Sequence, residues 1–304
     1  MTDAVATGGA GVRVSVVIRT LNEVRYLDEL LCAIAAQAWP GAEVESVIVD
    51  SGSTDGTLAI AERHGCRITH IRRDQFSFGR SLNLGCEFAR GDILVMVSGH
   101  CVPTGPGWLR ALCEPVADGR VSYSYGRQIG GPQSRFSECR IFAKYFPAQS
   151  QLPQQGFFCN NANSAIGRAA WQRLRFDEEV TGLEDMELAQ RLQREGGRIG
   201  YVADACVYHH HAEGWAQVQR RFEREALALQ KIMPQIHVRR RDTLRYIWSS
   251  IWRDWRHAAR AGRWPATAWE IVRYRISQYI GSFKGNHEHR KLSHAEKEKY
   301  FYPH

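Results

Sequence analysis

VSVVIRTLNE at residues 14–23 and VDSGSTDGT at residues 49–57 set the architecture of this chain. Each stretch is a β-branched apolar run that ends in polar and turn-forming residues. A short run of this kind is typical of a strand buried on both faces. Between the two, residues 26–37 carry leucine and isoleucine at helical spacing. Strand, helix and strand in this order predict a βαβ unit.

The same alternation continues toward the C-terminus. Further helices and strands are expected at Thr57–His64, Cys66–Ile71, Asn83–Arg90, Asp92–Val97 and Ile199–Val207. This pattern predicts an α/β domain with a doubly wound, mostly parallel sheet. Ligands of such sheets bind at the carboxyl ends of the strands, so we expect Thr20, Asp50 and His100 to line one crevice.

The composition is that of a globular protein. Of 304 residues, 44% are hydrophobic and 24% charged, which excludes a fibrous or disordered chain. No apolar run approaches the roughly 20 residues that span a bilayer. The first residues lack the basic flank and apolar core of a secretory signal, and the eight cysteines contain no C-x-x-C pair. Reduced thiols and a cytoplasmic location are therefore expected.

Positive charge is concentrated near the C-terminus. Residues 239–304 contain 15 Lys or Arg and 6 Asp or Glu, whereas the rest has 40 − 15 = 25 basic and 32 − 6 = 26 acidic residues. Five of the nine tryptophans lie in the same segment. This change of composition predicts three parts: a flexible N-terminus (1–12), the main α/β domain (13–237) and a basic, Trp-rich helical region (238–304).

Four blocks in order resemble family 2 glycosyltransferases of the GT-A fold. They are VSVVIRTLNE and VDSGSTDGT, then ANSAIG at residues 162–167 and GLEDMELAQRL at residues 182–192. Within the family, QFSFGRSLNLG (75–85) and YGRQ (125–128) are most similar to bacterial rhamnosyltransferases of cell-surface polysaccharide synthesis. The resemblance implies inverting transfer of a hexosyl or deoxyhexosyl group from a UDP- or dTDP-sugar to a glycan or lipid-linked acceptor.

Glu184 and Asp185 are the expected catalytic pair. Inverting transfer needs a carboxylate that removes the proton of the acceptor hydroxyl. The resemblance assigns this role to Asp185, with Glu184 supporting the site or positioning the acceptor. The alternative is a helix N-cap or first-turn acid.

Nucleotide contacts are expected from the first strands and the region after them. Asp50 could accept hydrogen bonds from a base or ribose, or could only cap its own loop. Thr20 and Glu23 follow the first strand, although Glu23 could simply begin a helix. The other expected contacts are Arg80, Asn83 and Ser98. Arg80 would bind the diphosphate, unless it is a surface arginine.

Histidines replace the carboxylates expected for a metal site. Ser98-Gly99-His100 occupies the place of the family's D-x-D motif, which weakens binding of a hard ion through oxygen ligands. His100, His209 and His211 could instead hold a divalent cation, Mn²⁺ or Mg²⁺, because imidazole suits transition metals. His209 and His211 share one face of their strand. Alternatively, His100 could hydrogen-bond phosphate directly.

Two helices are expected in the C-terminal region, the second at Ala266–Ile280. One apolar face of the first carries Leu244, Ile247, Trp248, Ile251 and Trp255, with arginines between them. This face could bind an anionic membrane surface from the cytoplasmic side, or could pack on the domain or on a second subunit in a homodimer. No recognition motif accompanies the basic charge, so no specific nucleic-acid partner is expected. Loss of the D-x-D carboxylates leaves a leading rival function, a non-catalytic sugar-nucleotide-binding protein. A nucleotidyltransferase is a further alternative, although no Gly-rich, Lys-containing phosphate loop opens the first strand.

Overall fold

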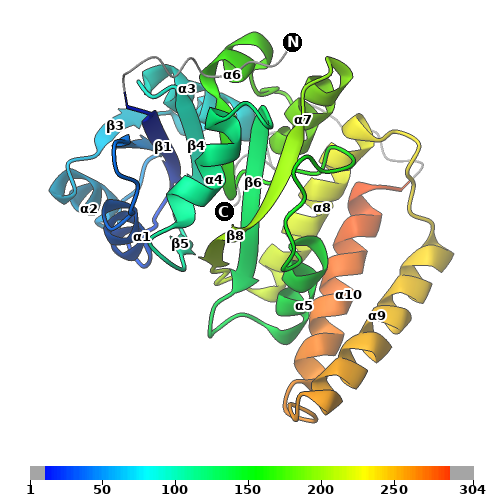
Figure 1. The fold of residues 1–304 in the computed structure, drawn as a ribbon. Helices are drawn as coiled ribbons and strands as arrows, with labels where there is room; N and C mark the ends of the chain where they lie inside the picture. Colours follow the sequence, from blue (N-terminus) through cyan, green and yellow to red (C-terminus); the bar gives the residue numbers. More distant parts are fainter. Residues whose placement is uncertain (1–10, 288–304) are drawn as a thin grey trace. The chain divides into compact units, whose positions relative to one another are not determined.

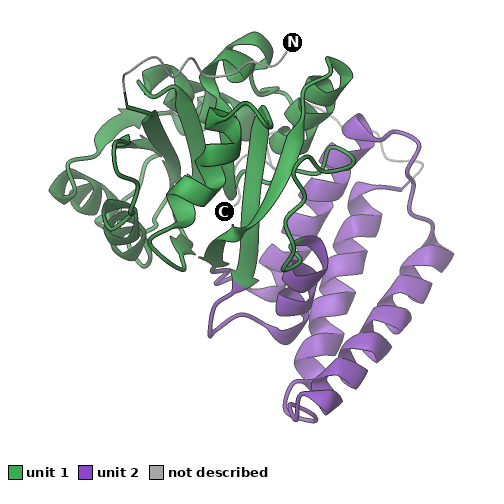
Figure 2. Ribbon diagram, in the orientation of Figure 1, with its two compact units in different colours: residues 1–129, 146–179, 184–209 green, residues 130–145, 180–183, 210–304 purple. Residues whose placement is uncertain are grey.

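Residues 11–287 are described by the structure, a computed structural model, and they divide into two compact units (Figures 1 and 2). The first comprises residues up to 129, 146–179 and 184–209; the second comprises 130–145, 180–183 and the residues from 210 on. The expected boundary at 237/238 therefore lies within the second unit. The flexible segment expected at 1–12 falls almost wholly outside the described residues.

A mixed sheet forms the centre of the first unit. Among the described residues it has eight strands: β1 Arg13–Thr20, β2 Glu43–Asp50, β3 Arg67–His70, β4 Ile93–Ser98, β5 Cys101–Pro103, β6 Tyr123–Gly130, β7 Asn163–Gly167 and β8 Ile199–His209. Their order is β3-β2-β1-β4-β7-β6-β8-β5. β1 runs parallel to both β2 and β4, and β2 runs parallel to β3. This half of the sheet agrees with the sequence-based prediction.

The other half of the sheet contains antiparallel pairs. β7 pairs antiparallel with β4 and β6, and β5 pairs antiparallel with β8. Only two residues separate the end of β4 from the start of β5. The turn between them is Gly99–His100. A residue predicted as a metal ligand, His100, therefore lies in the short turn between two strands.

Six helices of the first unit surround the sheet. They are α1 Leu27–Ala35, α2 Thr57–Arg63, α3 Phe78–Phe88, α4 Trp108–Ala117, α6 Arg168–Leu174 and α7 Glu184–Arg194, and a 3₁₀ turn spans Arg73–Gln75. α1 buries Leu27, Leu30, Leu31 and Ile34, as its spacing predicts. Gly85 of α3 allows close packing on β1 and β2, because a Cβ there would lie 2.4 Å from Val17 and 2.7 Å from Val49.

α3 begins five residues earlier than the sequence predicted. Ser77 is its N-cap, and the Ser77 hydroxyl accepts a hydrogen bond from the Arg80 N–H at 3.1 Å. A serine in this position satisfies one of the unpaired N–H groups of the first turn. The prediction that the helix starts at Asn83 was wrong, and both Arg80 and Asn83 lie within the helix.

The second unit is helical. It contains α5 Phe136–Tyr145, α8 Trp215–Ile232, α9 Arg240–Arg260 and α10 Ala268–Gly285. Its core includes Phe136, Ile251, Ala258 and Ile271, with Ile247, Trp255 and Val272 packed against them. None of the helices described between residues 11 and 287 combines the length and apolar character needed to cross a membrane.

Candidate active site

Asp185 is held at the start of α7 in the first unit. Its Oδ2 accepts the Asn161 N–H at 2.8 Å, and its Oδ1 accepts the Met186 N–H at 2.7 Å. Leu183, just before the pair, has a left-handed backbone (φ 55°), which is unfavourable for a large side chain. Burial, and after it the charge of the neighbouring Glu184, raises the pKa of Asp185 to about 7, although the two backbone hydrogen bonds lower it. A carboxyl group with this pKa can exchange a proton near neutral pH.

Arg19 was missed by sequence reasoning. It lies on β1, and its Nη1 is 3.5 Å from Glu184 Oε1 and donates to the Phe78 carbonyl at 3.1 Å. The guanidinium also lies 5.1 Å from the centre of the Phe78 ring. Its charge acts on Asp185 too, lowering the pKa against the effect of burial. The sequence did contain a signal for Arg19, namely a cation within an otherwise apolar strand.

The backbone that holds Asp185 is itself fixed by buried hydroxyl groups. Tyr123 Oη and Ser164 Oγ both donate to Asn161 Oδ1, the latter at 2.8 Å. Asn163, also buried, accepts from Trp108 Nε1 at 2.9 Å and donates to the Ala205 carbonyl at 2.8 Å. The asparagine cluster therefore connects strands and helices, and through Asn161 it orients Asp185.

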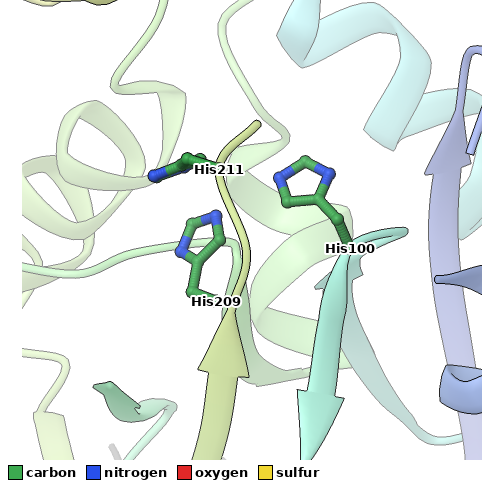
Figure 3. A group of neighbouring side chains, drawn as sticks. All are labelled: His100, His209 and His211. Atoms are coloured by element: carbon green, nitrogen blue, oxygen red, sulfur yellow. The ribbon is translucent and has the colours of Figure 1, made fainter. Parts of the chain in front are cut away.

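His100 and His209 stack on each other in the first unit. Their ring centroids are 5.2 Å apart with the planes inclined by 27°; Figure 3 draws them together with His211, two residues after His209. His100 Nδ1 lies 2.9 Å from Glu23 Oε1. Because a carboxylate only accepts, His100 Nδ1 carries the proton, and in the neutral ring Nε2 has the lone pair.

A chain of hydrogen bonds assigns the same tautomer to His209. The Ala162 N–H donates to Asn160 Oδ1 at 3.0 Å, so this atom is an acceptor. Gln128 Nε2 also donates to it, at 2.9 Å, which leaves Gln128 Oε1 to face His209 Nδ1 at 2.7 Å. His209 Nδ1 is thus protonated, and Nε2 has the lone pair. A ring oriented through Nδ1 in this way is typical of metal-ligating histidines.

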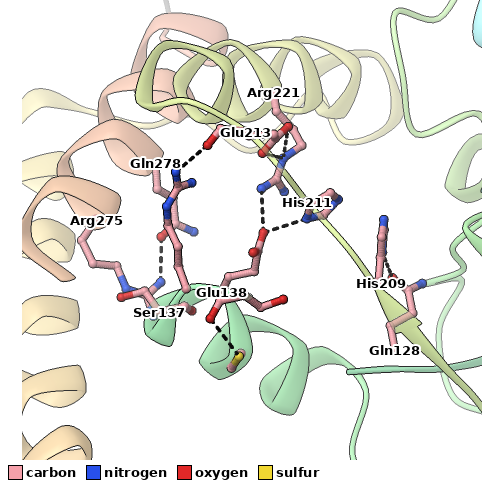
Figure 4. Close-up of polar contacts among 12 residues, drawn as sticks. Gln128, Ser137, Glu138, His209, His211, Glu213, Arg221, Arg275 and Gln278 are labelled. Atoms are coloured by element: carbon pink, nitrogen blue, oxygen red, sulfur yellow. Dashed lines mark hydrogen bonds and ion pairs between the residues drawn. The ribbon is translucent and has the colours of Figure 1, made fainter. Parts of the chain in front are cut away.

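His211 belongs to the second unit, where a charged network orients it. Its Nδ1 is 2.7 Å from Glu138 Oε1, which also accepts from Arg221 Nη2 at 3.2 Å (Figure 4). Arg221 Nε contacts Glu213 at 3.0 Å. The guanidinium of Arg221 thus bridges both carboxylates, and Glu138 orients the His211 ring.

Asp50 and Thr20 meet at the ends of β2 and β1. Asp50 is 1% exposed. Its Oδ1 accepts from Thr20 Oγ1 at 2.9 Å and Ser53 Oγ at 2.5 Å, and its Oδ2 accepts from the N–H groups of Gly52 and Ser53. Burial alone would raise the pKa of Asp50, but these hydrogen bonds outweigh it and lower the pKa. The bonds are those of a loop-capping carboxylate; contact with a nucleotide stays a prediction.

Glu23 and Gly99 pack against each other beside His100. The Glu23 N–H donates to Thr57 Oγ1 at 2.8 Å. A Cβ on Gly99 would lie 2.8 Å from Glu23 Cγ, so a larger residue between Ser98 and His100 would displace this side chain. Glu23 is therefore the direct partner of the predicted metal ligand His100.

Arg80 and Asn83 share a partner, Glu178. Arg80 Nε donates to Glu178 Oε2 at 2.8 Å, and Asn83 Nδ2 donates to Glu178 Oε1 and to the Phe176 carbonyl, each at 2.9 Å. Asn83 Oδ1 accepts from Trp171 Nε1 and the Phe176 N–H. The Asn83 amide thus links α3 to the segment after α6. Contact of Arg80 or Asn83 with a nucleotide stays a prediction.

The loop at 160–162 brings two groups of predicted residues together. Asn161 holds the proposed base Asp185, while its neighbours Asn160 and Ala162 complete the chain to His209. His209 stacks on His100, which contacts Glu23. The loop therefore connects the carboxylate of Asp185 to a pair of oriented imidazoles within the first unit.

Comparison with known families identifies the family of the chain. The model described as "Glycosyl transferase family 2" matches residues 15–179, and "Glycosyl transferase family group 2" matches residues 140–274. The chain is 31% identical over 208 residues to poly(ribitol-phosphate) beta-N-acetylglucosaminyltransferase TarS of Staphylococcus aureus, covering 64% of this chain and 35% of TarS. It is 27% identical over 178 residues to O-antigen chain rhamnosyltransferase WbaN of Salmonella anatum, covering 54% and 56%. The chain thus spans about a third of the length of TarS and about half of the length of WbaN.

Solved structures share the fold. The mannosyltransferase PcManGT of Pyrobaculum calidifontis, in complex with GDP-Man and Mn²⁺, superimposes with a TM-score of 0.61 at 20% identity, covering 93% of this chain and 90% of PcManGT. Residues 1–349 of S. aureus TarS superimpose with a TM-score of 0.52 at 18% identity, covering 88% and 90%. The GT-A fold predicted from the sequence is confirmed.

Proposed function

The chain belongs to glycosyl transferase family 2, and from this premise we propose that it is an inverting glycosyltransferase. Its donor would be a UDP- or dTDP-linked hexose or deoxyhexose. Its acceptor would be a hydroxyl of a cell-surface glycan or of a lipid-linked precursor, reached at the cytoplasmic face of the membrane. Relatives named as a poly(ribitol-phosphate) transferase and an O-antigen chain rhamnosyltransferase support this substrate class.

The observation that carries the proposal is the environment of Asp185. Its two oxygens accept backbone N–H groups, and burial raises its pKa to about 7. In the reaction, the acceptor oxygen forms a bond to the anomeric carbon as the bond from that carbon to the diphosphate breaks. The electron pair leaves with the nucleoside diphosphate, and Asp185 takes the hydroxyl proton. Attack from the opposite side inverts the anomeric centre.

The same proposal includes a divalent cation held by histidine. The donors fit a borderline ion such as Mn²⁺ better than Mg²⁺, because the Nδ1 protons of His100 and His209 are engaged and Nε2 has the lone pair in each. We propose these two rings as ligands, with His211 as the third predicted ligand. A bound ion would supply positive charge for the leaving diphosphate.

The donor nucleotide would lie along the ends of β1, β2 and β4. Thr20, Glu23, Asp50 and Ser98 would shape the base and ribose site, with Arg80 and Asn83 at its edge. Because Asp50 and Asn83 accept or donate four hydrogen bonds each within the protein, we propose that they act mainly by holding their loops in place.

The rival function, sugar-nucleotide binding without transfer, is favoured by one observation: His100 stands where the family has a metal-binding carboxylate. Asp185→Asn separates the two. We expect it to lower transfer by roughly 10²–10⁴-fold, the usual contribution of a general base, with donor affinity changed only a few-fold. Donor affinity is measured by thermal shift with UDP- and dTDP-sugars, and transfer by release of nucleoside diphosphate.

Glu187→Gln is the matched control. Glu187 is another acid in the first turn of α7, but it pairs with Arg191 at 2.6 Å. The control should keep its activity. Equal turnover of Asp185→Asn and wild type would remove Asp185 from the mechanism, and wild type that binds donors but never transfers would favour the rival function.

A further inference from the structure

The outward side of α9 carries a row of large apolar side chains. At 100° per residue, positions 244, 248 and 252 follow one another along one side of a helix. Leu244, Trp248 and Trp252 are 60%, 67% and 62% exposed. The sequence-based apolar face is therefore divided, because Ile247, Ile251 and Trp255 belong to the core of the second unit.

Arginines flank this row. On a helical wheel one of them lies within the sector of the row and four lie in the sector on one side of it, and all are exposed: Arg241, then Arg245, Arg253, Arg256 and Arg260. We call these five arginines and the three apolar residues the α9 face.

Little negative charge opposes the arginines. Residues 239–287 contain three carboxylates, Asp242, Asp254 and Glu270. Asp254 is buried and bonded to Arg275 at 2.7 Å, and Glu270 accepts the Phe136 N–H at 2.9 Å. Asp242 is 3.8 Å from Arg245, at the edge of ion-pair distance. The α9 face therefore keeps a large positive charge beside exposed tryptophan.

We infer that the α9 face binds the surface of an anionic lipid bilayer. Tryptophan favours the interface between headgroups and acyl chains, and arginine binds the headgroup phosphates. A second copy of the chain fits less well, because a twofold contact would bring five arginines against five others. A nucleic acid would use the arginines but would leave Leu244 unmatched.

The test is co-sedimentation of the full-length protein with vesicles that contain no glycan and no nucleotide sugar. Its outcome is thus independent of the proposed transferase activity. We expect binding to phosphatidylcholine vesicles containing phosphatidylglycerol, weaker binding to phosphatidylcholine alone, and loss of binding at high salt. Arg245→Glu with Arg256→Glu should weaken binding by more than tenfold, since each arginine near the surface contributes about fivefold. Trp248→Ser with Trp252→Ser should weaken binding at every salt concentration at which the wild type still binds.

Matched controls come from the first unit. Arg90→Glu with Arg194→Glu removes the same charge from exposed arginines outside the α9 face and should leave binding near that of wild type. Circular dichroism checks that all variants fold. Equal binding by wild type and the α9 variants would overturn the inference. So would dimerisation that depends on Trp248, or binding to duplex DNA as tight as binding to the vesicles.

Discussion

At the residue scale, the charge on Asp185 depends on neighbours that act in opposite directions. Burial and Glu184 raise its pKa, while the Asn161 and Met186 N–H groups and Arg19 lower it. Tyr123 and Cys159, which also interact with it, are kept neutral by burial. Arg19 is thus the nearby cation that favours the ionised base. A base is active when ionised, so the rate should rise with pH through about 7.

We predict that Arg19→Gln moves this rise to higher pH. Without the cation the carboxylate is less stable, its pKa increases, and the acidic limb of kcat/KM against pH should shift upward by roughly one pH unit. Arg19→Lys keeps the charge and should keep the limb near its original position. An unchanged limb in Arg19→Gln would mean that Arg19 only packs against Phe78.

The oriented histidines lead to a prediction about metal dependence. We expect EDTA to inactivate the enzyme and Mn²⁺ to restore activity better than Mg²⁺, as imidazole ligands prefer. His209→Ala should weaken Mn²⁺ binding measured by calorimetry, and Gln128→Leu should weaken it by roughly 10–100-fold because the ring loses its partner. The exposed His237→Ala is the control. Full activity in EDTA would instead favour direct contact of His100 with phosphate.

At the scale of elements, the amide of Asn83 fastens α3 to the chain after α6. We predict that Asn83→Ala lowers the free energy of unfolding by about 2–4 kcal/mol, since Trp171 Nε1 and both backbone groups of Phe176 lose their partner in a buried site. Glu87→Ala, an exposed change on the same helix, should stay within about 0.5 kcal/mol. Urea unfolding measures both. Similar stability of the two variants would contradict the structural role and favour a nucleotide contact.

Elements with a strong local pattern were predictable. β1, β2 and β4 were predicted from their β-branched runs, and α1 was predicted from its leucine spacing. The start of α7 was predicted from its acidic residues. The early start of α3 depended on the single cap Ser77, and the antiparallel half of the sheet depended on pairing between segments distant in the chain. The candidate site followed the same rule. The acidic start of a helix indicated Asp185 and a histidine cluster at a strand end indicated His209, whereas Arg19 and Gln128 became visible only through their partners in space.

At the scale of the whole molecule, the units do not follow the order of the chain. α5 interrupts the segments of the first unit, yet its Phe136 and Ser137 are part of the second, where Ser137 donates to Asp254 at 2.7 Å. The change in composition at residues 238–239 marks the outward-facing charge of α9 and not the limit of a core. Composition reports what faces the solvent, and packing between distant segments decides which residues form one unit.

Removal of the residues after Val238 should therefore unfold the second unit. α10 packs so closely on α8 that a Cβ on Gly281 or Gly285 would lie 2.3 Å from the Gln219 carbonyl and 2.2 Å from that of Glu223. The truncation also takes Ile251 and Ile271 away from Phe136, and each such buried side chain contributes about 1.5–3 kcal/mol. We expect the truncated chain to be found in the insoluble fraction, whereas Trp248→Ser with Trp252→Ser stays soluble because both side chains are exposed. Expression, gel filtration and limited proteolysis distinguish the two. A truncated chain that is monodisperse and melts cooperatively would show that α9 and α10 are not needed for the fold.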